Sequence, residues 1–226
     1  MNTRTDILQD RLEYQFRDAQ LLESALTHRS FSRRNYERLE FLGDAALNLV
    51  ISQALFERCP DLAEGDLSRM RATLVKGDTL AQIAQELDLG RFLRLGAGAR
   101  KTGGFRRKSI LADAIEAVIG AVYLDGGFPA VSGLIARLFT SRLENLPSVD
   151  DLKDAKTRLQ EYLQGRGVPV PRYEVLEVTG ADHEQQFLVA CHIDNTDQSY
   201  TGQGRSRRQA EQRAAESAYQ VLSGHE

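Results

Sequence analysis

The sequence predicts two domains of different class, an all-α domain followed by a small α+β domain. Apolar residues recur at helical spacing up to about residue 144, and no strand-like alternation of any length occurs before residue 170. A polar stretch at 145–153 contains proline and is typical of a linker. Residues 154–224 then follow the order helix, three strands, helix, which makes a complete α-β-β-β-α domain.

The composition is that of a globular protein and excludes several other classes. Of the 226 residues, 42% are apolar and 27% are charged, both ordinary values. No apolar stretch approaches the ~18 residues that span a bilayer, and the N-terminus lacks the apolar core of a signal peptide, so we expect a cytoplasmic protein without a membrane segment. Cys59 and Cys191 lie too far apart in sequence for a cysteine zinc motif or a disulfide scaffold. The net charge of −3 argues, taken alone, against a nucleic acid partner, but basic residues cluster locally at 100–108 and 205–213.

One predicted helix of the all-α domain carries an acidic face. Glu37, Glu40 and Asp44 fall within roughly 60° of one another, with apolar residues on the opposite side. A solvated acidic face is the simplest interpretation. However, Phe41 adjoins the acids, and Gly43 inside a helix costs roughly 1 kcal/mol relative to alanine. We therefore expect another part of the protein to pack close to Gly43.

A second predicted helix repeats this pattern. Asp113 and Glu116 share a face with the small residues Ala117 and Gly120. If the two helices cross there, four carboxylates converge, and they cannot all be ionised in a buried space without bound protons or cations. An all-oxygen cluster suits Mg²⁺ or Mn²⁺, and such a site suits hydrolysis of a phosphodiester.

The α+β domain carries local signals for each of its elements. A helix is expected at 154–164 with Asp154 as its N-cap. Strands are expected at 173–178, at 187–193 and near 198–201.

The last helix is expected to start near Ser206, which has capping-box spacing with Gln209. Arg205, Arg207 and Arg208 stand at this helix start, where the helix dipole disfavours cations. A bound phosphate would relieve that conflict, so we interpret this basic run as a binding site.

The acidic segments resemble the signature of the ribonuclease III family, the endonucleases that cut double-stranded RNA. The match covers residues 5–127, with helices continuing to about 144, and includes the segments Leu26–Ser30, Glu37–Asp44 (ERLEFLGD), Glu64–Ala72 and Ser109–Ala117. The resemblance implies that Glu40, Asp113 and Glu116 bind Mg²⁺, for which Mn²⁺ can substitute. It also implies catalytic roles for Asp44 and Glu116 and accessory acidic roles for Glu37 and Glu64.

Members of this family are homodimers, and the resemblance gives Phe41 a role at the dimer interface. In that interpretation Phe41 fills a cavity in the partner subunit. The alternative is that Phe41 belongs to the core of its own subunit.

The second domain resembles the double-stranded RNA-binding domain, which reads the shape of about 16 base pairs. The resemblance implies that Thr157, Gln160 and Glu161 contact one minor groove and that His183 lies in a loop at a second minor groove. Phosphates across the intervening major groove would be bound by Arg205, Arg207 and Arg208. Gln209 departs from the family pattern because many homologues carry lysine there, so one phosphate contact is expected to be missing.

The function implied is hydrolysis of both strands of double-stranded RNA, leaving 5′-phosphates and short 3′ overhangs, in the processing of ribosomal, messenger and transfer RNA precursors. The alternative is a regulator that binds double-stranded RNA without cleaving it. The presence of all four core acids argues against that alternative. A nucleotide phosphohydrolase would need His-Asp pairs that the sequence lacks.

Overall fold

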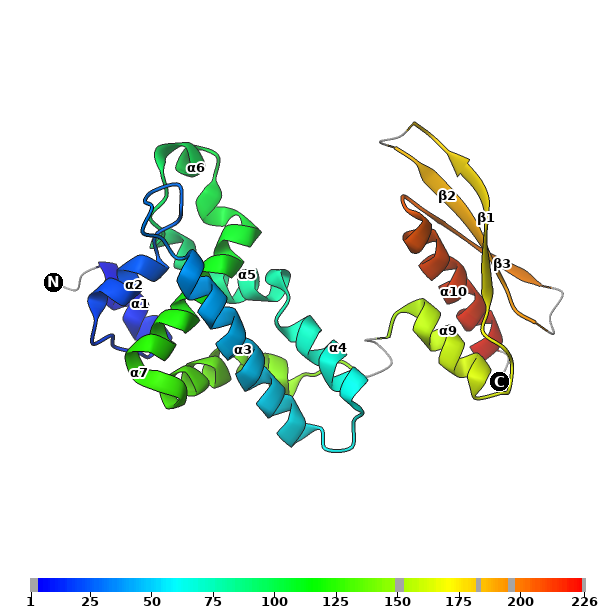
Figure 1. The fold of residues 1–226 in the computed structure, drawn as a ribbon, viewed down its shortest axis with the longest axis horizontal. Coiled ribbons are helices and arrows are strands. Elements are labelled where there is room, and N and C mark those ends of the chain that lie inside the picture. The colour runs from blue at the N-terminus through cyan, green and yellow to red at the C-terminus, as the bar shows by residue number, and fades with distance from the viewer. Residues whose placement is uncertain (1–3, 149–152, 182–183, 195–197, 225–226) are drawn as a thin grey trace. The chain divides into compact units, whose positions relative to one another are not determined.

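A helical unit and an α+β unit make up the chain (Figure 1), and the expected fold class is confirmed. The computed structural model describes residues 4–148, 153–181, 184–194 and 198–224. The two compact units are Met1–Pro147 and Ser148–Glu226.

In its described part, from residue 4 onward, the helical unit contains α-helices joined by turns and two short 3₁₀ helices. Its elements are α1 (Arg4–Leu12), α2 (Ala19–Ala25), α3 (Glu37–Arg58), α4 (Glu64–Leu74), α5 (Gly77–Glu86), η1 (Leu89–Arg91), α6 (Ala97–Lys101), η2 (Gly104–Arg106) and α7 (Lys108–Glu144).

The centre of the helical unit is α7, which packs against α2, α3 and α5. Its fully buried side chains, among them Ile115, Ile119 and Phe139, form the core together with Leu47 and Ile51 of α3. The run of α7 is interrupted at Gly127, whose φ of 75° lies in the left-handed region that favours glycine. The interruption falls in the glycine pair Gly126-Gly127.

By length and composition, α3 and α7 are apolar enough to cross a membrane, with windows of mean hydropathy 1.3 and 1.5. The expectation that no stretch would reach this level was therefore wrong. Both helices form the core of the helical unit, with 33% and 44% of their window residues buried inside it. Core helices satisfy the same compositional criterion as membrane spans, so the criterion is weak evidence here.

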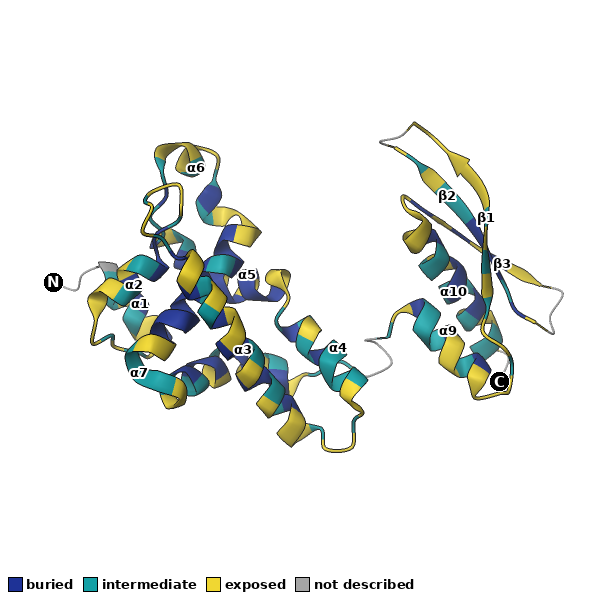
Figure 2. Ribbon diagram, in the orientation of Figure 1, coloured by how far each residue is buried: buried dark blue, intermediate teal, exposed yellow. Residues whose placement is uncertain are grey.

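The α+β unit contains one antiparallel sheet with strand order β1-β2-β3 and two helices on one of its faces (Figure 1). Its elements are α9 (Ala155–Gln164), β1 (Arg172–Thr179), β2 (Gln186–His192), β3 (Ser199–Gly204) and α10 (Arg207–Ser223). The side of α10 that packs on the sheet carries its buried residues (Figure 2), which are alanines at 210, 214, 215 and 218.

Glycines set the contact between β3 and α10. A β-carbon on Gly202 would lie 2.2 Å from the backbone nitrogen of Ala214, and one on Gly204 would lie 2.7 Å from that of Ala210. The strand therefore runs on through Gly204, beyond the end expected near Thr201. Gly202 and Gly204 are thus strand residues pressed against a helix.

Candidate functional site

The acidic residues of α3 and α7 are brought together by a backbone crossing. A β-carbon on Gly43 would lie 1.8 Å from the carbonyl oxygen of Glu116, so only glycine fits at this point. The close approach expected from the sequence is present. It places the acidic turns of the two helices side by side.

The start of α3 is stabilised by a side chain of the residues directly before it. Asn35 Oδ1 accepts a hydrogen bond of 2.9 Å from the backbone nitrogen of Glu37, which satisfies one of the free donors at the helix start. Glu37 and Glu40 lie in the first turn, where the positive end of the helix dipole favours carboxylates.

Three of the predicted acids line a cavity of about 340 Å³. Glu37, Glu40 and Asp113 contribute to its wall, and Asp44 and Glu116 do not. The same cavity is lined by basic and aromatic side chains, namely His28, Arg29, Tyr36 and Arg107. Its chemistry therefore combines carboxylates with groups that attract a phosphate.

The carboxylates act on one another electrostatically. Burial, followed by the charges of Asp44, Glu40 and Asp113, raises the pKa of Glu116 to about 8. Burial is also the main cause that raises the pKa values of Glu40 and Asp113. The cluster carries more negative charge than its surroundings compensate, and a bound cation or proton would relieve the repulsion.

Two residues next to the acids were not identified from the sequence. Arg29 Nη1 lies 3.6 Å from Glu37 Oε1, so a basic side chain from the loop before α3 offsets part of the acidic charge. Tyr36 is buried and its hydroxyl donates a long hydrogen bond of 3.5 Å to Asp113 Oδ2. The spacing of residues along the chain predicts neither contact, because each depends on how the loop before α3 lies against the helix crossing.

His28 contributes to the framework of this site. Its ring packs edge-on against Tyr36, and its Nδ1 lies 2.7 Å from the hydroxyl of Ser30. Burial, together with the positive charge of Arg29, lowers the pKa of His28 and favours the neutral ring.

Glu64 is not brought together with the other acids. It lies at the start of α4 and accepts a hydrogen bond of 2.8 Å from Ser68. Through Arg71, α4 contacts Ser52 of α3, about two turns beyond Asp44. Asp44 itself is exposed and accepts a hydrogen bond of 2.8 Å from Asn48.

The donor chemistry of the helix crossing fits a hard divalent cation, because the acids offer only oxygen ligands. Their mutual repulsion is the kind that such an ion would relieve. Within the stretches that the structure describes, no three His, Cys, Asp or Glu side chains are already gathered into a metal-binding group. The four acids thus interact electrostatically without forming a closed set of ligands.

Phe41 is 79% exposed in the chain, so the interpretation as a core residue of its own subunit is wrong. It borders an apolar hollow of about 720 Å³ that is also lined by Leu39, Leu42 and Leu124. A large ring exposed beside such a hollow is typical of an interaction surface.

The α+β unit presents the predicted residues of α9 on its exposed side. Thr157 is half-buried, and Gln160 and Glu161 are exposed, whereas Ala155, Leu159 and Leu163 face the core. Asp154 caps the helix as expected, accepting a hydrogen bond of 2.9 Å from the backbone nitrogen of Thr157. His183 lies outside the described residues.

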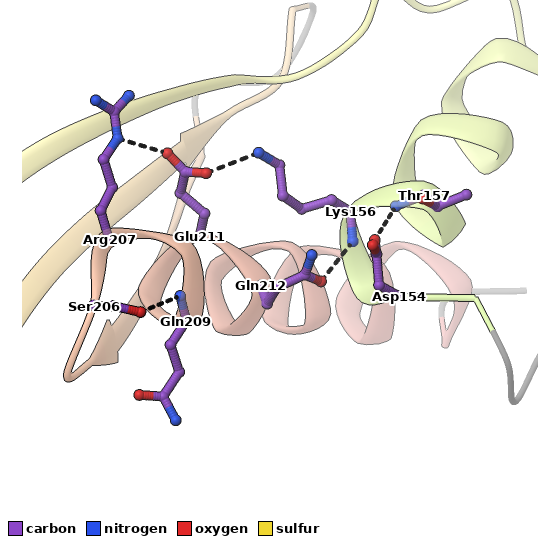
Figure 3. Close-up of polar contacts among 8 residues, drawn as sticks. All are labelled: Asp154, Lys156, Thr157, Ser206, Arg207, Gln209, Glu211 and Gln212. Atoms are coloured by element: carbon purple, nitrogen blue, oxygen red, sulfur yellow. Dashed lines mark hydrogen bonds and ion pairs between the residues drawn. The ribbon is translucent and has the colours of Figure 1, made fainter. Parts of the chain in front are cut away.

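The start of α10 differs in detail from the expected capping box. Ser206 accepts a hydrogen bond from the backbone nitrogen of Gln209, but the Gln209 side chain reaches the backbone of Arg205 and not that of Ser206. The basic side chains Arg205, Arg207 and Arg208 are all exposed. Arg207 also makes an ion pair with Glu211, so the positive charge at this helix start is partly compensated within the protein (Figure 3).

Comparison with known proteins identifies both units. A Ribonuclease-III-like family model matches residues 18–143, and a double-stranded RNA binding motif matches residues 155–222. The chain belongs to the ribonuclease III family. The expectation of an endoribonuclease that acts on double-stranded RNA is thereby confirmed.

Ribonuclease III relatives match over nearly their full length. The Ribonuclease 3 of Alkalilimnicola ehrlichii is 57% identical over 96% of this chain and 95% of that protein. The Ribonuclease 3 of Hahella chejuensis is 54% identical over 98% of each chain. A solved nuclease domain of ribonuclease III from Campylobacter jejuni, described for flexibility in a region involved in dimer formation, is 43% identical with a TM-score of 0.61. It covers 63% of this chain and 100% of its own.

The ribonuclease III family match places the α3–α7 crossing within the nuclease-like segment. The RNA-binding motif contains α9, the three strands and most of α10. The acid cluster and the basic helix start therefore belong to separate units.

Proposed function

We propose that the α3–α7 acid cluster is the catalytic centre of a divalent-metal-dependent endoribonuclease. It hydrolyses phosphodiester bonds in both strands of double-stranded RNA and leaves 5′-phosphates and short 3′ overhangs. The observation that carries the proposal is the close crossing of α3 and α7 at Gly43 and Gly120, which sets the acidic turns of the two helices side by side. The raised pKa of Glu116, to about 8, agrees with this crowding of carboxylates. Ribosomal, messenger and transfer RNA precursors are the proposed substrates, and the cytoplasm, away from membranes, is the proposed location.

Glu40, Asp113 and Glu116 are the proposed ligands for Mg²⁺, with Mn²⁺ as a substitute. The chemistry supplied by a bound ion is activation of a water molecule for attack on phosphorus and stabilisation of the leaving oxygen. Side-chain rotation of the acids would be needed to form the ligand set, because they are not yet gathered around one point.

The surrounding side chains have complementary tasks. Tyr36 holds Asp113 in place through its hydroxyl, and Arg29 holds Glu37. Arg107 lines the same cavity and is placed to attract the scissile phosphate. Asp44, exposed beside Glu116, is the proposed fourth catalytic acid, while Glu37 is an accessory acid.

A homodimer is the proposed assembly, with Phe41 in a cavity of the partner subunit. The exposure of Phe41 and the apolar hollow beside it support this surface as the contact. Glu64, which lies apart from the other acids within one chain, would then act as an accessory acid on substrate.

The α+β unit supplies the affinity for RNA. Thr157, Gln160 and Glu161 are proposed to contact one minor groove, and His183 a second one. Arg205, Arg207 and Arg208 are proposed to contact the phosphates between them.

The test is incubation of the full chain with a long duplex RNA in Mg²⁺, in Mn²⁺ and in EDTA, with single-stranded RNA as the control. Short duplex fragments with 5′-phosphates are expected in either metal and not in EDTA. Tight duplex binding without cleavage in both metals would instead indicate the non-cleaving regulator.

A further inference from the structure

Glu211 is a shielded carboxylate that joins the first turns of α9 and α10. Only 13% of its side chain is exposed. One of its oxygens accepts a hydrogen bond of 2.8 Å from Arg207 Nε, and the other accepts one of 2.9 Å from Lys156 Nζ (Figure 3). The hydrogen bond from Lys156, helped by that from Arg207, holds the pKa of Glu211 below its usual range, so the residue is ionised at neutral pH.

A neighbouring side chain reinforces the same junction. Gln212 Oε1 accepts a hydrogen bond of 3.2 Å from the backbone nitrogen of Lys156. The Lys156 ammonium also lies 4.2 Å from the centre of the Tyr173 ring, which restricts its position further. The starts of the two helices are therefore held at one spacing by adjacent residues of α10.

The hydrogen bond from Arg207 to Glu211 leaves the two terminal guanidinium nitrogens available to a ligand. It uses Nε, and the two terminal nitrogens point away from Glu211 (Figure 3). Without this partner, Arg207 would be a flexible exposed side chain at the positive end of a helix dipole. Glu211 thus fixes one rotamer of Arg207 and directs its remaining donors outward.

A carboxylate beside a phosphate-binding surface is electrostatically unfavourable for RNA. Its presence there is understandable if it fixes the geometry of the cationic side chains. We propose that Glu211 is a positioning residue for double-stranded RNA. It fixes Arg207 and holds the starts of α9 and α10 at the spacing at which both helices contact one duplex. This inference rests on the proposed RNA-binding face.

The two effects of Glu211 predict opposite outcomes for Glu211→Gln. Removing a negative charge would tighten RNA binding if only overall charge mattered. Loss of positioning would weaken it by about tenfold, the size expected for one charged hydrogen bond. The slope of log affinity against log salt would also fall by about one, since each phosphate contact contributes about 0.9.

The matched control is Glu216→Gln. Glu216 lies on the same helix and makes an ion pair with Arg158 of α9, so this variant removes the same charge and another link between the same helices. It does not touch Arg207. We expect its affinity to stay within about twofold of wild type, because neither Glu216 nor its partner Arg158 belongs to the proposed RNA contacts.

The experiment measures binding of the full chain to a 30-base-pair RNA duplex across a salt series in EDTA, with thermal unfolding of each variant. Wild-type protein that fails to prefer duplex over single-stranded RNA would overturn the proposed RNA-binding face itself. Wild-type preference combined with Glu211→Gln binding as tightly as wild type, at an unchanged salt slope, would overturn the positioning role alone.

Arg207→Gln keeps the inference testable if Glu211→Gln unfolds the α+β unit, because Arg207 is exposed. We expect it to lower the salt slope by about one. If Glu211→Gln does fold, adding it to Arg207→Gln should lower the slope little further, since both changes remove the same contact. An unchanged salt slope in Arg207→Gln would mean that Arg207 makes no phosphate contact. Glu211 could then not act by positioning Arg207, and the inference would be overturned.

Discussion

A β-carbon on Gly120 of α7 would lie 2.2 Å from the carbonyl oxygen of Leu39 in α3. The two helices meet backbone to backbone at this point, with Gly43 as the second small residue of the contact. This spacing buries Glu116 and brings the carboxylates of α3 close to it, and both effects, burial first, raise its pKa. The electrostatics of the cluster therefore depend on the glycines as well as on the acids.

Gly120→Ala should destabilise the helical unit and weaken cleavage together, because the added methyl group forces the helices apart. The expected loss of unfolding free energy lies at or above the upper end of the roughly 1–3 kcal/mol typical of overpacking. Chemical unfolding measures it. Gly98→Ala is the control, since its β-carbon meets nothing within 4 Å. Equal unfolding free energies for the two variants would show that α3 and α7 can move apart without loss of stability.

Glu116→Gln should abolish cleavage while leaving duplex binding intact. The amide removes the charge of a proposed metal ligand, and the RNA-binding residues lie in the other unit. Cleavage rates in Mg²⁺ and duplex affinity in EDTA are the two measurements. Cleavage by the variant at the wild-type rate would contradict the assignment of Glu116 as a metal ligand.

The stability of the metal-free protein should depend on pH through Glu116. Folding raises its pKa from 4.5 to about 8. The stabilisation from keeping the neutral acid is complete below the unfolded pKa and is lost as pH rises through the folded pKa. We therefore expect the wild-type Tm in EDTA to fall between about pH 4.5 and pH 8.

Glu116→Gln should flatten this decline, whereas Glu57→Gln, on the exposed side of α3, should keep it. Adding Mg²⁺ at pH 8 should raise the Tm of wild type and not of Glu116→Gln. Identical profiles of Tm against pH for wild type and Glu116→Gln would show that Glu116 is not the source of the pH dependence.

Phe41→Ala should dissociate the proposed dimer without unfolding its subunits. The ring is 79% exposed in one chain, so its removal leaves the subunit core unchanged. Loss of its contact across the dimer should amount to about 3–5 kcal/mol, which is more than a hundredfold in the dissociation constant. Sedimentation at decreasing concentration measures this constant.

Leu176→Ala, which truncates an exposed apolar side chain of the α+β unit, is the control for Phe41→Ala. It should leave the dissociation constant unchanged. A Phe41→Ala protein that remains dimeric at nanomolar concentration would place the interface elsewhere.

Much of the fold was predictable because its signals are local. Helical spacing of apolar residues predicted α3 and α7, and a period-two pattern predicted β2, since both patterns span only a few neighbouring residues. The side chain of Asp154 sufficed to predict the start of α9.

Local patterns were insufficient where a distant element changes the outcome. Gly202 and Gly204 are turn residues by propensity, and they extend β3 because α10 lies directly against them. Similarly, Arg29 approaches Glu37 only because the loop before α3 folds back on the helix.

The sequence by itself determined which residues can do chemistry here: acids at helical spacing beside Gly43 and Gly120, and arginines at the start of α10. Only the tertiary structure decided how these groups behave. The raised pKa of Glu116 requires burial against another helix, and the link from Glu211 to Lys156 joins residues 55 positions apart. Electrostatic energy depends on distance and burial in space, and neither is encoded in the spacing of neighbours along the chain.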